Sequence, residues 1–469
     1  MSGTVFAGLA PHPPILVPEI GLNSLEEIEE TKESMERFAK EIKESDPDLI
    51  ITISPHGPVF RDAISILSTQ ELVGDFAQFG QPDLKFNYQL KEEFTQEIIK
   101  ATNNIGTTVA RIDQAAADKL DIDFKLDHGV LVPLYYLEEV GVELPLIPIT
   151  MGMLSYEELY KFGKVIQIVA KKFGYKVAVI ASGDLSHRLT ADAPAGFNPH
   201  GREFDEAVVE YLDNLEVEEL FNLDSSLIEK AGECGLRPLI MMLGTIDGLD
   251  VEGGVLSYQG PFGVGYAVAS YRVKGEKEVD SLLEQIIANK KAKLEGVRKN
   301  ESEVVRLARQ AVEEYAKNKE VIAPPSELDP RLAKKAGVFV SLKKDEQLRG
   351  CIGTTEPTQD NIAEEVINNA LSAAFKDPRF EAVNLNELEE LTYSVDILGE
   401  PKEVENIQQL DPKKYGVIVK QGDRTGLLLP DLEGVDTAAK QVEIAKRKAG
   451  ITLNEADVEL MRFKVTRYT

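Results

Sequence analysis

Three apolar, β-rich runs in the first half of the sequence each lead into a histidine. Residues 4–9 precede His12, residues 49–53 precede His56, and residues 177–181 precede His187. Near-continuous hydrophobic runs are typical of strands buried on both faces, as in a parallel sheet covered by helices. Ligands of such sheets gather at the carboxyl ends of the strands. The pattern therefore predicts that these histidines converge, however far apart they lie in the sequence.

The distribution of histidine places the chemistry in the N-terminal half. The chain has 469 residues, and all five of its histidines lie within the first 200; they are His12, His56, His128, His187 and His200. Imidazole is a common ligand of catalytic transition metals and the usual acid–base group near neutral pH. We therefore expect a metal site or an acid–base site in the first 200 residues.

The composition excludes several classes of protein. The chain is too long for one core, and its 43% hydrophobic and 28% charged residues describe a soluble globular protein. A net charge of −28 opposes nonspecific binding to nucleic acid or to an anionic membrane. No apolar run approaches the roughly 18 residues of a membrane span, and no signal peptide is apparent. Cys234 and Cys351 suggest no disulfide framework. These features predict a protein of the reducing cytoplasm.

The first 273 residues are expected to form an α/β domain. Strands and helices alternate through the first 180 or so residues, which predicts a mixed, largely parallel sheet. Helices then dominate residues 202–243, and residues 253–273 are typical of two closing strands. The expected earlier helices are 25–43, 92–102 and 156–173, and the expected strands include 48–54 and 144–150.

A second domain is expected from residue 301 to residue 469. Residues 274–300 are strongly charged and weakly periodic, which predicts a solvated helix or a linker at the boundary. Helices and strands are less regularly interleaved after it, which indicates a compact α+β domain. The expected helices are 301–317, 361–375 and 437–448, and the expected strands are 338–342, 348–353, 391–398 and 458–466, with a hairpin at 416–430.

Proline-bounded turns hold the first two histidines. His12 lies between Pro11 and Pro13, and His56 lies in Ser54-Pro55-His56-Gly57-Pro58. Proline restricts the backbone beside the imidazole, and such rigidity suits a metal ligand. The alternative for each is a hydrogen-bonded histidine at a strand end.

The next two histidines have aspartates nearby. His128 follows Asp127, and His187 lies in Ser182-Gly183-Asp184-Leu185-Ser186-His187. A carboxylate beside an imidazole orients the ring or raises its basicity. The competing interpretation of both aspartates is a helix N-cap. His200 follows a loop, and we expect it at the surface.

A third metal ligand is available in Glu233-Cys234-Gly235. Two histidines with a carboxylate form the facial triad of non-haem Fe(II) oxygen chemistry, whereas a thiolate favours softer metals such as copper or zinc. Cys234 has a further alternative, because free cysteine often packs as a small hydrophobe. Adjacent side chains point in different directions, so only one of the two is expected to bind the ion. The paired histidines favour Glu233.

Taken in order, these motifs resemble a known family. Pro11-His12-Pro13, Pro55-His56-Gly57, Asp127-His128-Gly129 with Pro133-Leu134, Gly183 to His187 and Glu233-Cys234-Gly235 are similar to motifs of the class III extradiol ring-cleavage dioxygenases, including DODA-type enzymes, and of their relatives, the Memo proteins. The resemblance covers the first 270 or so residues.

The resemblance implies a role for each residue. His12, His56 and Glu233 would hold Fe(II), His187 would be the acid–base residue with Asp184 beside it, and His128 would line the pocket. Memo-like proteins have a cysteine where Cys234 stands, which keeps Cys234 open as the third ligand and copper or zinc open as the metal.

The second domain has its most distinctive run at Leu348-Arg349-Gly350-Cys351-Ile352-Gly353-Thr354. Arg349 is a candidate for binding an anion, and the glycines beside Cys351 permit close approach by a ligand or another chain. The alternative is a glycine-kinked strand with a buried cysteine. This run and residues 375–380, 393–404 and 415–430 resemble the AMMECR domain across nearly all of residues 300–469.

The two resemblances together imply two functions from different classes. The first is a non-haem Fe(II) oxidoreductase that acts on a catechol-like or other small aromatic substrate with O2, while the AMMECR domain binds a partner or substrate. The second is a metal-binding adaptor without dioxygenase activity. The combination resembles the AmmeMemoRadiSam system, whose third member is a radical SAM protein. No cysteine triplet for an iron–sulfur cluster occurs in this sequence, so that member would be a separate partner.

Overall fold

A computed structural model describes residues 2–277, 281–327, 329–344, 347–432, 434–452 and 458–469. It divides into two compact units, Met1–Ile287 and Ala288–Thr469. The division falls inside the charged 274–300 segment; residues 278–280 of that segment lie outside the described residues. Helix α11 (Leu282–Asn300) crosses the division and has no buried residue. No helix of the described parts is long and apolar enough to cross a membrane.

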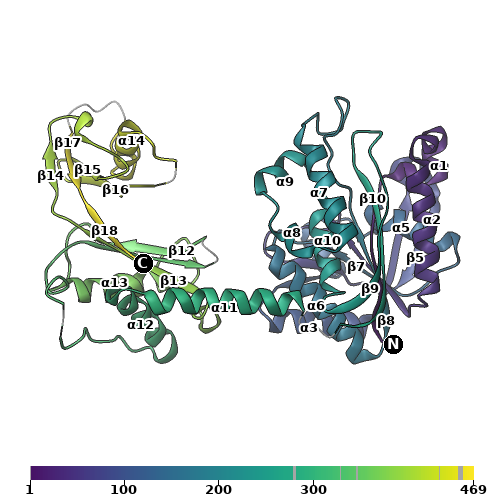
Figure 1. Ribbon diagram of the computed structural model, residues 1–469, viewed down its shortest axis with the longest axis horizontal. Coiled ribbons are helices and arrows are strands. Elements are labelled where there is room, and N and C mark those ends of the chain that lie inside the picture. Colours follow the sequence, from purple (N-terminus) through teal and green to yellow (C-terminus); the bar gives the residue numbers. More distant parts are fainter. Residues whose placement is uncertain (1, 278–280, 328, 345–346, 433, 453–457) are drawn as a thin grey trace. The chain divides into compact units, whose positions relative to one another are not determined.

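The N-terminal unit is built on an eight-stranded sheet (Figure 1). Its order is β6-β3-β7-β2-β8-β1-β10-β9, and neighbours within the central run β7-β2-β8-β1 are parallel. The strands are β1 (Gly3–Ala10), β2 (Leu49–Ser54), β3 (Ile64–Leu67), β6 (Val109–Ile112), β7 (Leu146–Thr150), β8 (Lys176–Ser182), β9 (Leu249–Gln259) and β10 (Tyr266–Glu276). The predicted mixed, largely parallel sheet is confirmed.

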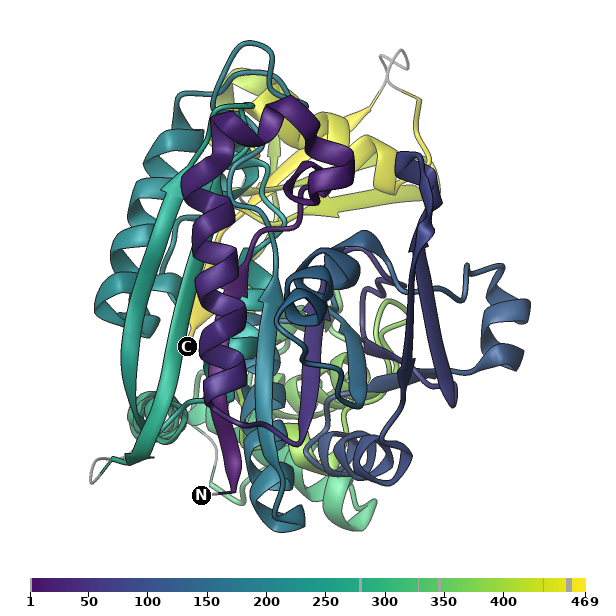
Figure 2. The ribbon, with the colours of Figure 1, turned by 90° about the vertical axis from the view of Figure 1, so that its right-hand side faces the viewer.

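Helices cover both faces of this sheet, which explains the apolar runs in its strands. Successive residues of β8 contribute to opposite clusters: Val177 and Val179 pack on one face, and Ala178 and Ile180 pack on the other. Helices α3 (Glu92–Asn104), α6 (Tyr156–Phe173), α7 (His200–Asn214) and α10 (Leu236–Gly244) cover the first face. Helices α2 (Glu29–Glu44), α4 (Gln114–Leu120) and α5 (His128–Glu139) cover the second, and α2 stands in front of the sheet in Figure 2.

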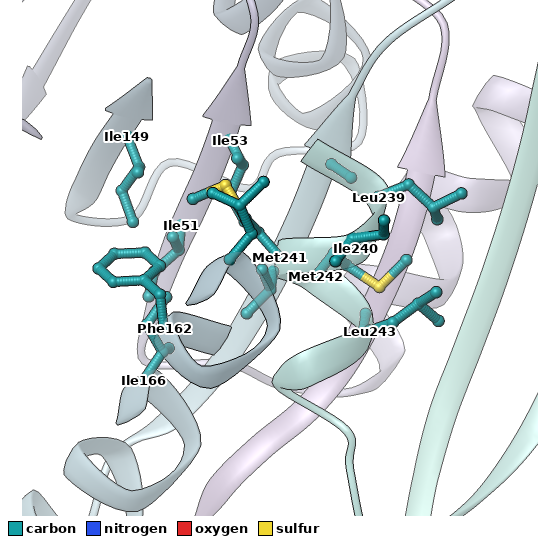
Figure 3. Packing of buried hydrophobic residues seen from close by; sticks show 14 of the residues in the cluster. Ile51, Ile53, Ile149, Phe162, Ile166, Leu239, Ile240, Met241, Met242 and Leu243 are labelled. Carbon is teal, nitrogen blue, oxygen red and sulfur yellow. The ribbon is translucent and has the colours of Figure 1, made fainter. Parts of the chain in front are cut away.

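The first face holds the larger core. Figure 3 shows Ile51, Ile53 and Ile149 of the strands packed beside Phe162 and Ile166 of α6 and beside the apolar α10 residues. Helices α6 and α10 approach each other so closely at Gly163 that a Cβ there would lie 2.0 Å from the carbonyl oxygen of Met241. This core fixes the strand ends from which the candidate site is built. Short helices α1 (Pro18–Gly21), α8 (Val217–Phe221) and α9 (Ser225–Ala231) and a hairpin of β4 (Glu71–Phe76) and β5 (Gln81–Gln89) complete the unit.

The C-terminal unit has two antiparallel sheets and matches the predicted α+β class. Sheet β12-β11-β13-β18 is covered by α12 (Glu303–Asn318) and α13 (Ile362–Phe375), and its strands are β11 (Val338–Lys344), β12 (Gln347–Gly353), β13 (Leu391–Leu398) and β18 (Val465–Tyr468). Sheet β14-β17-β15-β16 packs against α14 (Ala438–Lys448), and its strands are β14 (Lys402–Val404), β15 (Gly416–Gln421), β16 (Arg424–Leu428) and β17 (Glu459–Phe463).

One expected strand of this unit is divided in two. The single strand predicted at 458–466 is instead β17 and β18, separated at Lys464, and the two belong to different sheets. Strand β17 pairs with β14 and β15, whereas β18 pairs with β13. Local propensity did not reveal the division because partners distant in the sequence impose it.

Candidate metal centre

Three histidines meet at the carboxyl end of the N-terminal sheet. His12 follows β1 by two residues, His56 follows β2 by two residues, and His128 begins α5. One ring nitrogen from each lies within 4.8 Å of the others. The Nε2 atoms of His12 and His56 are 2.9 Å apart, and the rings of His56 and His128 stack with centroids 4.3 Å apart. The arrangement brings imidazoles from three separate parts of the sequence to one point.

His12 forms two hydrogen bonds with residues at and just after the end of β8, the strand that pairs with β1. Its backbone N–H donates to Oδ1 of Asp184 at 3.0 Å, and its Nδ1 lies 2.9 Å from the hydroxyl of Ser182. The residue is buried, with 2% of its surface exposed. Because Nδ1 is engaged by the protein, the atom of His12 that faces the other imidazoles is Nε2.

A second serine links His56 to helix α5. The hydroxyl of Ser54 accepts a hydrogen bond from the backbone N–H of His56 and donates to Oδ1 of Asp127 at 2.6 Å. Asp127 is the N-cap of α5 and accepts from the N–H of Gly129. A Cβ at Gly129 would lie 2.5 Å from the Ser54 oxygen, so the close approach of helix and strand requires glycine here. Asp127 therefore is an N-cap, and it also ties His128 to the end of β2.

Burial keeps the three imidazoles neutral. It lowers the pKa of His12 well below its ordinary value, and the nearby His56, His128 and His187 lower that pKa further. The pKa values of His56 and His128 are also lowered, in each case mainly by burial. Neutral imidazole is the form that binds metals.

The donor set fits a transition metal. Two of the three imidazole nitrogens lie 2.9 Å apart, close enough for one ion to bind both with metal–nitrogen bonds of about 2.1 Å. His56 is exposed, so the cluster is open to solvent on its side. Imidazole ligands suit iron, copper, nickel and zinc alike, so the geometry does not select one of them.

Cys234 and Asp184 lie beside the histidines. The Sγ atom of Cys234 is 3.8 Å from Nε2 of His12, and Oδ2 of Asp184 is 3.9 Å from the same nitrogen. The two residues also hold each other, because the N–H of Asp184 donates to Sγ and the N–H of Cys234 donates to the carbonyl of Asp184. Burial raises the pKa of the Cys234 thiol well above its ordinary value and raises the pKa of Asp184 to about 7.

The carboxylate of Glu233 is directed toward helix α10. Its Oε2 accepts a hydrogen bond from the N–H of Leu236, the first residue of that helix, at 2.6 Å. Burial raises the pKa of Glu233, and Arg237 opposes that change. Glu233 and Cys234 thus point in different directions, and it is the thiol that lies near His12.

The two remaining histidines differ in setting. His187 is half-buried, and burial followed by the nearby His56 lowers its pKa. Its Nε2 is buried and has no hydrogen-bond partner among the described residues. His200 begins α7 and pairs with Glu203 at 2.7 Å on the surface. His187 therefore lies in the surroundings of the cluster, where it helps to lower the pKa of His12, whereas His200 pairs with Glu203 at the surface.

Three residues near the cluster were not predicted from the sequence to belong to the site. Ser54 and Ser182 are the last residues of β2 and β8, and the ring of Phe79 lies 5.5 Å from that of His128. Both serines stand inside the motifs that predicted the histidines, which is the one signal that points to them. Phe79 follows the hairpin strand β4, and nothing in its local sequence links it to the site.

In the C-terminal unit, Arg349 and Cys351 lie on the edge strand β12. Arg349 forms a two-pronged ion pair with Glu387, with contacts of 2.7 and 3.1 Å. The N–H of Cys351 donates to Asp377, and the thiol accepts a hydrogen bond from Ser341 at 3.2 Å. The anion beside Arg349 is therefore a carboxylate of the protein itself. A role of either residue in binding a ligand or partner stays a prediction.

A helix-covered, largely parallel sheet with a histidine cluster at its carboxyl edge defines an α/β domain equipped for metal binding. Residues 7–269 match the family model of the catalytic LigB subunit of aromatic ring-opening dioxygenase, and residues 305–468 match the AMMECR1 model. The chain belongs to the LigB family and carries a C-terminal AMMECR1 domain. Both resemblances predicted from the sequence are confirmed.

Relatives share these regions. A Clostridium acetobutylicum protein is 40% identical over 464 residues, which is 98% of each chain. A Thermotoga maritima protein is 51% identical over 166 residues, 35% of this chain and 95% of the relative. Two solved structures, both described as uncharacterized proteins, are also similar. One, from Pyrococcus horikoshii, is 34% identical with a TM-score of 0.33 and covers 35% of this chain and 88% of its own. The other, from Escherichia coli K12, is 16% identical with a TM-score of 0.41 and covers 57% and 99%.

Proposed function

We propose that the N-terminal unit is an Fe(II)-dependent oxidoreductase of the extradiol-dioxygenase type, acting on a catechol-like or other small aromatic substrate with O2. The observation that carries the proposal is the convergence of His12, His56 and His128, with two Nε2 atoms 2.9 Å apart. Membership of the LigB family, which is named for an aromatic ring-opening dioxygenase, supports iron over the other metals that imidazole binds.

In this proposal His12, His56 and His128 hold the ion. The ion would supply a Lewis acid with open positions for the substrate oxygens and O2. The protein's part is to keep the imidazoles neutral by burial and to hold them in place through Ser182, Asp184 and Ser54. Phe79 forms an aromatic wall beside His128 against which a flat ring can pack.

His187 is the proposed acid–base residue. Its lowered pKa leaves the imidazole neutral near pH 7, so it can accept a proton from a substrate hydroxyl. The unpartnered Nε2 is the atom available for that transfer. Asp184, with a pKa raised to about 7 by burial, is a second group able to hold or release a proton near neutrality.

A second function is favoured by one specific observation, the position of Cys234. Its thiol, and not the Glu233 carboxylate, lies near His12, and a thiolate favours copper or zinc. The second candidate is therefore a metal-binding adaptor without dioxygenase activity that works with a separate radical SAM protein. In both candidates the AMMECR1 domain binds a partner or substrate.

One experiment separates the two functions. The full chain is loaded anaerobically with Fe(II), its iron content is measured, and it is mixed with a panel of catechols and O2. The proposed function predicts consumption of O2 with formation of yellow ring-cleavage products, and His187→Ala serves as a control that keeps iron. Full iron occupancy without ring cleavage across a broad panel would favour the adaptor.

A further inference from the structure

The protonation state of a single imidazole nitrogen follows from a short chain of contacts behind the metal site. Ser182, the last residue of β8, is fully buried. Its hydroxyl lies 2.5 Å from the carbonyl oxygen of Gly129 and 2.9 Å from Nδ1 of His12. These two neighbours compete for one hydroxyl proton, because serine has a single O–H.

The carbonyl of Gly129 decides where that proton goes. A carbonyl oxygen only accepts hydrogen bonds, so at this separation the Ser182 hydroxyl donates to it. The hydroxyl oxygen must then accept from Nδ1 of His12. Nδ1 therefore carries a proton, and Nε2 keeps the lone pair that a metal needs.

Helix α5 explains why this carbonyl is free to accept. In an α-helix the carbonyl of residue 129 would accept from the N–H of residue 133. That residue is Pro133, inside the helix, and proline has no N–H. The carbonyl of Gly129 thus lacks its usual helical partner and is bonded by Ser182 instead.

We propose that Pro133, acting through the Gly129 carbonyl and the Ser182 hydroxyl, fixes the proton of His12 on Nδ1 and leaves Nε2 as the metal-binding atom. Ser182 and Pro133 are positioning residues, since neither touches the site of the ion. The proposal rests on the metal site proposed above, but the tautomer is a property of the metal-free protein and is measured without metal.

The test uses the full chain labelled with ¹⁵N-histidine. Long-range ¹H–¹⁵N spectra of the metal-free protein report which nitrogen of His12 is protonated, and the signals of His12 are assigned by their loss in His12→Gln. The wild type should show the Nδ1–H form. Ser182→Ala should lose this preference, and Pro133→Ala should weaken it, because an alanine N–H competes for the Gly129 carbonyl.

Metal affinity gives a second readout. Co(II) titration should show a loss of roughly tenfold or more in Ser182→Ala, as is common when a hydrogen-bond partner of a metal-binding histidine is removed, and a smaller loss in Pro133→Ala. Thr52→Val is the matched control, because Thr52 is a fully buried hydroxyl of β2 with no partner among the described residues. It should leave both the tautomer and the affinity unchanged.

The outcomes are distinct. An Nε2–H form of His12 in the metal-free wild type, or an unchanged tautomer in Ser182→Ala, would overturn the inference. An Nδ1–H form in a wild-type chain that binds no Co(II) would support the tautomer assignment and overturn the proposed metal site.

Discussion

The Sγ atom of Cys234 lies 3.8 Å from Nε2 of His12, although 222 residues separate them in the sequence. The loop before α10 brings the thiol to the end of β1, and the backbone of Asp184 holds it there. The short distance makes the thiol a candidate fourth donor beside the three imidazoles. Because burial raises the pKa of the thiol, a metal ion would have to displace its proton on binding.

Cys234→Ser should lower metal affinity more than Glu233→Gln does. Serine is a poorer ligand than thiolate for softer metals, whereas the Glu233 side chain bonds the first turn of α10. Weakening that cap should cost about 1 kcal/mol of stability with metal stoichiometry retained. The Co(II) spectrum is the measurement: a sulfur-to-metal charge-transfer band should be present in the wild type and absent in Cys234→Ser. Loss of the ion in Glu233→Gln, with binding retained in Cys234→Ser, would make the carboxylate and not the thiol the fourth ligand.

His187→Ala should retain the metal while losing most activity, by about 10²–10⁴-fold. The physical reason is that its Nε2 has no hydrogen-bond partner among the described residues and is available for proton transfer. Iron content and catechol turnover are measured on the same preparation. Loss of the iron itself would instead make His187 a ligand.

Asp205→Asn should change how stability depends on pH. Asp205 is fully buried, accepts hydrogen bonds from Ser186 and Tyr258, and has a pKa raised to about 7, mainly by burial. The folded state therefore holds a proton that the unfolded state releases near pH 4, so this residue's contribution to stability declines as pH rises from about 4 to about 7. Asparagine does not ionise, so in Asp205→Asn the contribution of this side chain to stability does not decline over that pH range.

The stability of Asp205→Asn relative to wild type should thus rise by up to about 1 kcal/mol per pH unit over that range and stay level above it. Hydrogen-exchange protection of the β8 amides at several pH values gives the measurement. A stability difference that is flat with pH would show that Asp205 is ionised throughout.

The central strands of the N-terminal sheet were predictable because strands buried on both faces have near-continuous apolar sequences. The apolar runs before His12, His56 and His187 lie within β1, β2 and β8. The convergence of His12 and His56 followed from the rule that parallel strands end at one edge. The strand order was not predictable: β8 lies between β1 and β2, and only that placement puts Ser182 against His12.

Other features of the site depend on contacts that leave no local pattern. The sequence favoured Glu233 over Cys234 as the metal ligand, but the directions of the two side chains depend on the packing before α10, which places the thiol near His12 and the carboxylate on the N–H of Leu236. The participation of His128 in the cluster depends on where α5 begins relative to β2, which Asp127 and Ser54 fix through a hydrogen bond between distant residues. Serine at a strand end is too common to mark such a role.

Limited proteolysis should separate the chain within residues 274–300. Helix α11 has no buried residue, although Leu282 and Leu283 at its start pack against the N-terminal core and Arg298 near its end donates to the carbonyl of Leu388. We therefore expect cleavage in the largely exposed middle of the helix. Mass spectrometry of the fragments should identify an N-terminal and a C-terminal product that each resist further digestion. Fragments that unfold and are degraded together would contradict two separately folding units.

Anaerobic equilibrium dialysis of the full chain against Fe(II), with His12→Ala, His56→Ala and His200→Ala beside the wild type, tests the central claim most directly. The wild type and His200→Ala should bind about one ion per chain. His12→Ala and His56→Ala should each bind with affinity lowered by roughly tenfold or more, as expected when a direct ligand is lost. Equal stoichiometry and affinity in all four proteins would contradict a metal centre built on these histidines.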